Sequence, residues 1–117
     1  MNILEYDVNE YGKSGSHLQG YITTDYDTLV SVLGKPSYTD ADPYAKVNCE
    51  WALTVKVPVE DDEDDWDYVN ATIYNWKDGC IPLNECEWHI GGFEYSAVEV
   101  VDAIMSGKIT PAYSEVA

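Results

Sequence analysis

The sequence contains no arginine, and its only strongly basic side chains are lysines. Lysine and arginine together number 6, against 22 aspartates and glutamates, and the formal net charge is −16 at pH 7. Binding to nucleic acid requires lysine or arginine at the phosphates, and anionic membranes attract basic segments for the same reason. We therefore expect no direct contact with nucleic acid and none with a membrane surface.

Cysteine is also scarce and irregularly spaced. Cys49, Cys80 and Cys86 form no Cys-x-x-Cys pair, whereas small secreted domains carry an even set of cysteines. Loose thiols are typical of a reducing cytosol. Residues 1–7 lack the basic and apolar segments of a secretory signal, and no apolar run approaches the ~20 residues that span a bilayer. These absences predict a cytoplasmic protein.

The remaining composition is that of a folded domain. Hydrophobic residues make up 45% of the chain and aromatic residues 13%, and acidic disordered tails lack such aromatic content. The length suits one domain. We expect a single domain over residues 1–117, with 1–16 and 108–117 loosely packed.

Two segments have the periodicity of amphipathic helices. Apolar residues recur every three or four positions over 26–33, after an acidic variant of the capping box at 24–27, and Gly34 follows as a stop signal. Residues 96–99 form a Ser-x-x-Glu capping box before a second apolar stripe, which ends at Gly107. The sequence thus predicts two helices.

Other segments alternate polar and apolar residues with a period of two, as half-buried strands do. The clearest are 47–57 and 68–77, which we expect to form an antiparallel pair joined by a long loop at 58–67. We interpret residues 37–45 as loop. Shorter strands are expected at residues 3–8, 17–22 and 86–90. This order predicts an α+β fold, with a single layer of about four to five antiparallel strands and two helices on one face.

Seven acidic residues fall within eight positions around Trp66: Glu60, Asp61, Asp62, Glu63, Asp64, Asp65 and Asp67. One interpretation is a solvated loop that aids solubility; another is adaptation to a saline habitat. A third is mimicry, because an extended chain rises ~3.3 Å per residue and one DNA strand ~3.4 Å per phosphate. A calcium loop does not fit, since Trp66 and Thr72 stand where it needs glycine and glutamate.

A second candidate site is aromatic and comprises Tyr68, Tyr74, Trp76, Trp88 and His89. The first three share one face of the expected strand 68–77. If helices cover only the other face, these rings form a surface on which a base or a partner side chain can stack. If both faces are covered, the rings are core residues. Both interpretations remain open at the level of sequence.

Groups that carry out catalysis or hold metals are not apparent. Cys86 and His89 are three residues apart, which places them on opposite faces of a strand. That separation argues against a shared zinc ion and against a Cys–His nucleophilic pair. No Ser/His/Asp set and no phosphate-binding glycine loop is present. We therefore expect a non-enzymatic protein without a metal or cofactor.

Four segments together resemble a family of small, mostly uncharacterised bacteriophage proteins. They are residues 26–36 (YDTLVSVLGKP), 50–51 (EW), 71–79 (ATIYNWKDG) and 87–92 (EWHIGG). The resemblance implies a role in an infected bacterial cytoplasm, and it implies no specific activity. A weaker likeness relates the helix ending Leu-Gly-x-Pro, with the aromatic strands after it, to the helix-plus-hairpin modules of β-lactamase-inhibitor-like proteins. That likeness implies a sheet that presents aromatic residues to another protein.

The favoured function is a phage-encoded, acidic inhibitor of a host protein with a basic surface. It would serve anti-defence or host takeover, through mimicry of nucleic acid by the acidic run. The alternative is a small-molecule binder, such as a sponge for a nucleotide signal, using the aromatic face and the backbone N–H groups near Gly91 and Gly92. The shortage of cations counts against that alternative. A minor virion component is a third possibility.

Overall fold

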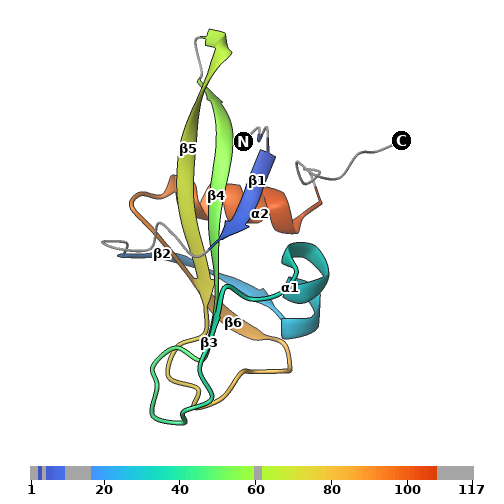
Figure 1. Cartoon of the computed structure of the whole chain (residues 1–117), viewed down its shortest axis with the longest axis vertical. Coiled ribbons are helices and arrows are strands. Elements are labelled where there is room, and N and C mark those ends of the chain that lie inside the picture. Colours follow the sequence, from blue (N-terminus) through green and yellow to red (C-terminus); the bar gives the residue numbers. More distant parts are fainter. Residues whose placement is uncertain (1–2, 4, 10–16, 60–61, 108–117) are drawn as a thin grey trace.

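The computed structural model describes residues 3, 5–9, 17–59 and 62–107 of the chain. Figure 1 shows a twisted sheet with two helices beside it. The elements in chain order are β1 (Glu5–Asn9), β2 (His17–Thr24), α1 (Tyr26–Leu33), β3 (Tyr38–Thr39), β4 (Cys49–Val59), β5 (Asp62–Tyr74), β6 (Cys86–Gly92) and α2 (Ser96–Met105). The predicted α+β class is confirmed.

All strands belong to one antiparallel sheet in the order β1-β4-β5-β6-β2, and β3 pairs with the start of β4. The central hairpin of β4 and β5 is its longest feature. The two strands pair from Glu50 opposite Tyr74 to Val59 opposite Asp62. The prediction of a long loop at 58–67 is therefore wrong, because β4 extends to Val59 and β5 begins at Asp62. Asp62 and Asp67 pair with Val59 and Val57, and the register shifts between these two pairs. Asp64, Asp65 and Asp67 are exposed, which leaves their carboxylates hydrated at strand positions.

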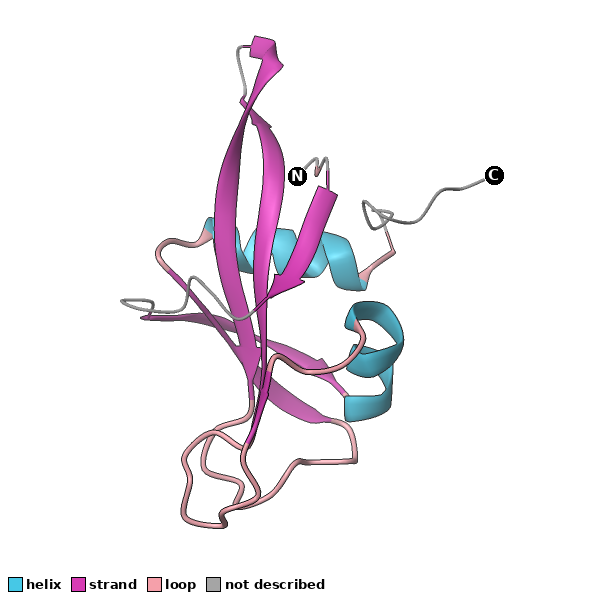
Figure 2. Ribbon diagram, in the orientation of Figure 1, coloured by secondary structure: helices cyan, strands magenta, loops and turns pink. Residues whose placement is uncertain are grey.

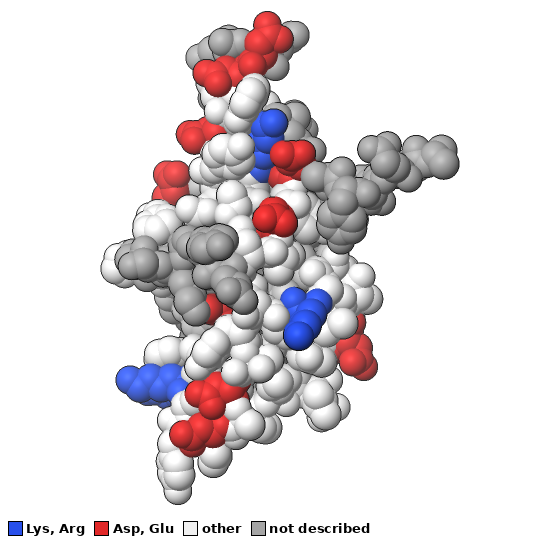
Figure 3. All heavy atoms as spheres, in the orientation of Figure 1, with Lys and Arg blue, Asp and Glu red and all other residues white. Residues whose placement is uncertain are grey.

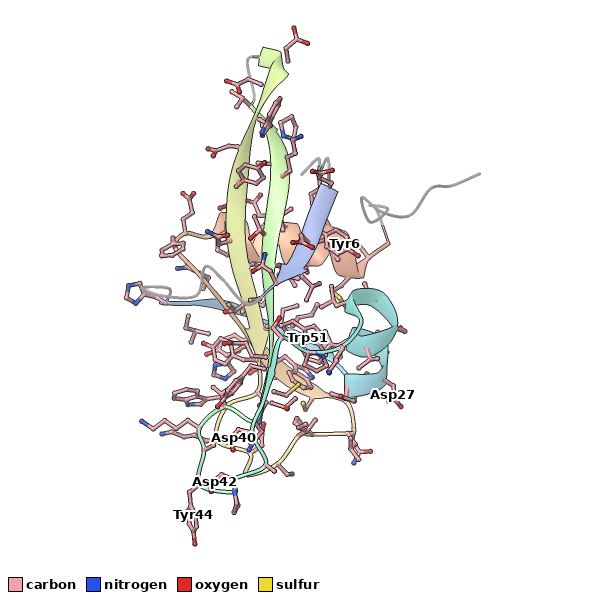
Figure 4. The ribbon with its side chains drawn as sticks, viewed as in Figure 1. Tyr6, Asp27, Asp40, Asp42, Tyr44 and Trp51 are labelled. Carbon is pink, nitrogen blue, oxygen red and sulfur yellow. The ribbon has the colours of Figure 1, made fainter. Side chains whose placement is uncertain are left out.

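Both helices pack on the same face of the sheet, as Figure 2 shows, and the core lies between. Trp51 of β4 and Trp88 of β6 are fully buried there, with ring centroids 5.8 Å apart. Their indole N–H groups donate to the carbonyls of Gly34 (2.9 Å) and Thr24 (3.2 Å). Figure 4 shows Trp51 between the sheet and α1. Each indole thus buries its rings without leaving a polar atom unpaired.

Both helix starts differ from the expected capping boxes. Asp25, rather than Thr24, caps α1, because its carboxylate accepts from the Thr28 N–H at 2.7 Å. That hydrogen bond also lowers the pKa of Asp25. In α2, Tyr95 is the capping residue and makes no side-chain cap bond. Ser96 is already helical, and its buried Oγ has no hydrogen-bond partner in the described structure.

Part of the segment interpreted as loop over 37–45 forms β3. Its two residues pair with Glu50 and Cys49 of β4. Ser37 strengthens this attachment: its N–H donates to the Glu50 carbonyl at 2.9 Å, and its Oγ accepts from the Ala52 N–H at 3.0 Å. A two-residue strand has no periodicity of its own, so only the long-range pairing reveals it.

The N-terminal strand β1 is anchored at the edge of the sheet. Tyr6 is 5% exposed, and its hydroxyl donates to the Val32 carbonyl at 3.4 Å. The segments expected to be loosely packed are 1–16 and 108–117; of these the structure describes only residue 3 and β1, and the rest lies outside the described residues. Within the described part of the chain, neither helix has the length and apolar character needed to cross a membrane.

Candidate functional site

The face of the sheet opposite the helices is called here the open face. Two groups of residues stand out near it, at opposite ends of the β4–β5 hairpin. One is the arm, residues 57–68, which extends beyond the helices along the longest dimension of the molecule (Figure 1). The other is the end where β4 begins and β5 finishes. Each candidate from the sequence belongs to one of these ends or to the core.

The arm carries the acidic run on a two-stranded ribbon. Asp64, Asp65 and Asp67 are exposed, and Figure 3 shows acidic side chains gathered at the far end of the hairpin. Asp67 pairs with Val57 and Trp66 pairs with Pro58. The backbone of Asp62 and Glu63 belongs to β5, whereas Glu60 and Asp61 lie outside the described residues.

Strand geometry changes the expected match to nucleic acid. Alternate side chains of a strand point to opposite faces, so Asp67 and Trp66, which pair with Val57 and Pro58, lie on opposite faces of the arm. Beyond them the register shifts, and Val59 pairs with Asp62. Carboxylates on one face are then ~6.6 Å apart, twice the ~3.4 Å rise per phosphate. A regular strand with carboxylates at alternate positions therefore matches every second phosphate rather than every phosphate.

The other face of the arm is aromatic. Trp66 is 46% exposed and Tyr68 57% exposed. The Lys56 ammonium lies over the Trp66 ring, 4.1 Å from its centroid, which is the geometry of a cation–π contact. The arm thus already binds one cation of this chain through a ring.

A hollow of about 210 Å³ opens at the base of the arm. Its lining includes Glu5 and Asp7 of β1 together with Lys56 and Tyr68, and is completed by Tyr6, Asn9 and Thr54. Two carboxylates against one ammonium make the hollow net negative, which favours a basic occupant. Nothing local in the sequence predicts this hollow, because β1 and β4 are brought together only by long-range pairing.

At the other end of the hairpin, four rings form the aromatic cluster: Tyr21, Tyr74, Trp76 and His89. The His89 ring centroid lies 5.0 Å from that of Tyr21, 5.3 Å from that of Tyr74 and 6.0 Å from that of Trp76. Register explains the cluster, because His89 pairs with Tyr21 on one side and Tyr74 on the other. Burial, with smaller effects from Glu50 and Tyr21, raises the pKa of Tyr74.

Two of the five predicted aromatic residues do not belong to this cluster. Trp88 is fully buried on the helix-covered face, because neighbours in a strand point to opposite faces and His89 occupies the open face. Tyr68 shares the open face but lies at the base of the arm. Tyr21 was missed, since nothing local in the sequence pairs β2 with β6.

Two lysines converge on the aromatic cluster. The ammonium groups of Lys46 and Lys77 lie 6.0 Å and 5.6 Å from the Trp76 ring centroid. Their backbones are joined as well, because the Lys77 N–H donates to the Lys46 carbonyl at 2.7 Å. Lys77 has φ +58°, a left-handed conformation that non-glycine residues adopt at a cost. Two of the six lysines of this acidic chain therefore lie beside one ring.

A buried pair of asparagines, called here the asparagine clamp, holds this end together. Asn75 Oδ1 accepts from the backbone N–H groups of Asn48 (2.8 Å) and Cys49 (2.9 Å). Asn75 Nδ2 donates to Asn48 Oδ1 at 3.1 Å and to the Cys80 carbonyl at 3.2 Å. Both asparagines are at most 1% exposed, so these hydrogen bonds are shielded from competing water.

The clamp also fixes the loop between β3 and β4. Asn48 Nδ2 donates to the carbonyls of Asp40 (2.8 Å) and Asp42 (3.0 Å). Figure 4 shows these two aspartates in that loop. Lys46 lies in the same loop, and Lys77 lies two residues after Asn75. The clamp therefore fixes the backbone near both lysines.

The cysteines and His89 serve different parts of the molecule. Burial, with a smaller effect from Glu50, raises the pKa of the Cys49 thiol to about 12. Cys86 packs against the hydrophobic core, whereas His89 contacts the rings of the open face. Cys80 is exposed. Among the described residues, no three histidine, cysteine or acidic side chains are placed to hold a metal ion together.

Comparison with known proteins gives no match. No family model fits the chain, and neither a curated protein nor a solved structure is significantly similar to it. Its function is therefore inferred from its own geometry and charge.

Proposed function

We propose that the protein is a non-enzymatic inhibitor that binds a basic surface of another protein through its arm. The observation that carries this proposal is the placement of the acidic run. The described part of the run, residues 62–67, lies on a two-stranded ribbon that extends beyond the helices (Figure 1), with an acid-lined hollow at its base. A narrow acidic projection can enter a groove that the body of the protein cannot.

The charge density of the arm favours binding over mere solubility. Residues 60–67 carry a charge of −7, and two carboxylates ~6.6 Å apart repel by roughly 0.6 kcal/mol in water. A cationic partner turns this repulsion into attraction and raises the rate of encounter. A protein that needed only solubility would gain as much from the same acids spread over its surface.

The two faces of the arm suggest which side chains the partner contributes. Asp67 suits lysine or arginine on one side, and Trp66 and Tyr68 offer rings for cation–π contacts on the other. The hollow beside Glu5 and Asp7 is large enough to admit one long basic side chain. A protein that binds nucleic acid presents such groups in a groove. The resemblance to bacteriophage proteins is the reason to seek that partner in a bacterial host.

Capture of proteins from a bacterial lysate tests the proposal with matched variants. The arm variant is Asp64→Asn/Asp65→Asn/Asp67→Asn. The control is Asp27→Asn/Glu94→Gln/Asp102→Asn, which removes three equally exposed charges elsewhere. We expect the wild type and the control to retain the same protein at low salt and to release it as salt rises, since salt screens exposed charges.

The arm variant should lose that protein, and inhibition of the partner's nucleic-acid binding should be lost with it. Equal loss in both variants would show that net charge matters and the arm does not. Capture that is insensitive to salt would also contradict the proposal.

A further inference from the structure

We propose that the aromatic cluster and the two lysines beside it form a second site, which binds a small aromatic anion such as a nucleoside monophosphate. The ring of the ligand stacks on the cluster, and its phosphate lies between the ammonium groups of Lys46 and Lys77. This site is separate from the arm and does not depend on the function proposed for it.

Its first component is a surface suited to a planar ring. Tyr21 is 48% exposed and Trp76 39% exposed, and both lie beside His89 on the open face. Among the described residues, no helix covers this face (Figure 2). Aromatic side chains arranged in this way bind bases of any sequence, since every base presents a flat π surface.

Its second component is local positive charge in a chain of net charge −16. The ammonium groups of Lys46 and Lys77 approach the same ring, although like charges repel. An anion between them removes that repulsion and adds two charge-assisted hydrogen bonds. A ring with an attached phosphate satisfies both components at once, whereas adenosine or inorganic phosphate satisfies only one.

The third component is backbone order. Lys77 adopts a left-handed conformation, and such strain in a non-glycine residue is typical of functional sites. The asparagine clamp and the bond from the Lys77 N–H to the Lys46 carbonyl hold the two loops in place. A glycine at position 77 would relieve the strain, so lysine carries a local conformational cost at this position.

The surrounding charge limits the size of the ligand. A polyanion would extend its further phosphates over an acidic surface, including Asp78, whose carboxylate is held by Asn75 Nδ2 at 3.2 Å. A mononucleotide places its single phosphate group at the lysines and reaches no further. A terminal nucleotide of a nucleic acid strand should therefore bind less tightly than a free mononucleotide.

Calorimetric titration of the full chain tests the site with AMP, adenosine, inorganic phosphate and a short oligothymidylate. We expect AMP to bind saturably and at least about tenfold more tightly than either fragment. The oligothymidylate should bind more weakly than AMP. Absence of saturable AMP binding at millimolar concentration, or tighter binding of the oligothymidylate, would overturn the proposal.

Variants then locate the binding. Lys77→Gly and Trp76→Leu should each weaken AMP binding about tenfold, with an unfolding midpoint for Lys77→Gly no lower than that of the wild type. Lys35→Ala removes one exposed lysine elsewhere and should leave AMP binding unchanged, as should the arm variant. Equal weakening by Lys35→Ala, or none by Lys77→Gly, would show that AMP does not bind at this site.

Discussion

The two ends of the β4–β5 hairpin are built from the same pair of strands and differ in how they satisfy their polar groups. At the clamp end, Asn48 and Asn75 are buried and bond to backbone groups of three segments. In the arm, Asp64, Asp65 and Asp67 are exposed to water. The first end is held by buried hydrogen bonds, whereas the Asp65 and Asp67 carboxylates of the second accept from the N–H of the next residue, at 2.8 Å each, and stay exposed to water.

This difference separates stability from binding along one hairpin. A buried hydrogen-bond network is costly to disturb, whereas exposed carboxylates contribute little to folding. Substitutions at the clamp should therefore act mainly on the free energy of unfolding, and substitutions in the arm mainly on binding.

The largest effect is expected from Asn75→Ala. This change leaves the buried N–H groups of Asn48 and Cys49 without their acceptor and should cost about 3 kcal/mol of unfolding free energy. Denaturant unfolding measures it as a lower midpoint at an unchanged slope. Asn9→Ala, on the arm side of the sheet, is the control and should cost about 1 kcal/mol. Equal costs would contradict the comparison.

A smaller effect follows from Cys49, the first residue of β4. Burial raises the pKa of its thiol to about 12 from 9.0, so above pH ~9 the unfolded chain loses this proton before the folded one does. Stability is then constant below that pH and falls above it by at most about 1.4 kcal/mol per pH unit, so the loss between pH ~8 and pH ~10 is about 1.4 kcal/mol. Unfolding of the wild type and of Cys49→Ala across this range checks the slope. Parallel curves would show that Cys49 does not contribute.

The smallest effect on folding is expected in the arm. The arm variant removes repulsion between exposed charges, so its unfolding free energy should equal or exceed that of the wild type by less than about 1 kcal/mol at low salt. High salt should abolish the difference. Denaturant unfolding at two salt concentrations measures it, and destabilisation by more than 1 kcal/mol would mean that the arm carboxylates support the fold.

Much of the fold follows from local patterns in the sequence. The helix at Tyr26–Leu33 and the strands β4 and β6 have clear periodicities. The early start of β5 at Asp62 was missed because seven carboxylates have low strand propensity, and only pairing with β4 overrides it. The cap of α2 was mispredicted because Ser96 fits the motif but already lies inside the helix.

The sites were harder to predict because they depend on register between distant strands. Alternation correctly placed Tyr74 and Trp76 together, but Tyr21 joins them only through the pairing of β2 with β6. Lys46 and Lys77 are 31 positions apart in the sequence, and the hydrogen bond between their backbones brings them together. The acidic run can be recognised from the sequence. That its residues from Asp62 onward belong to a strand paired with β4 cannot.

The most direct test of the central claim is a chemical-shift map of backbone amides during titration with an arginine-rich peptide. The peptide supplies the basic groups of the proposed partner without its fold. We predict that shifts concentrate in residues 62–70 and 5–9, while the amides of the clamp end at 75–80 remain unchanged. Shifts spread evenly over the acidic surface, or concentrated away from the arm, would contradict the assignment of binding to the arm.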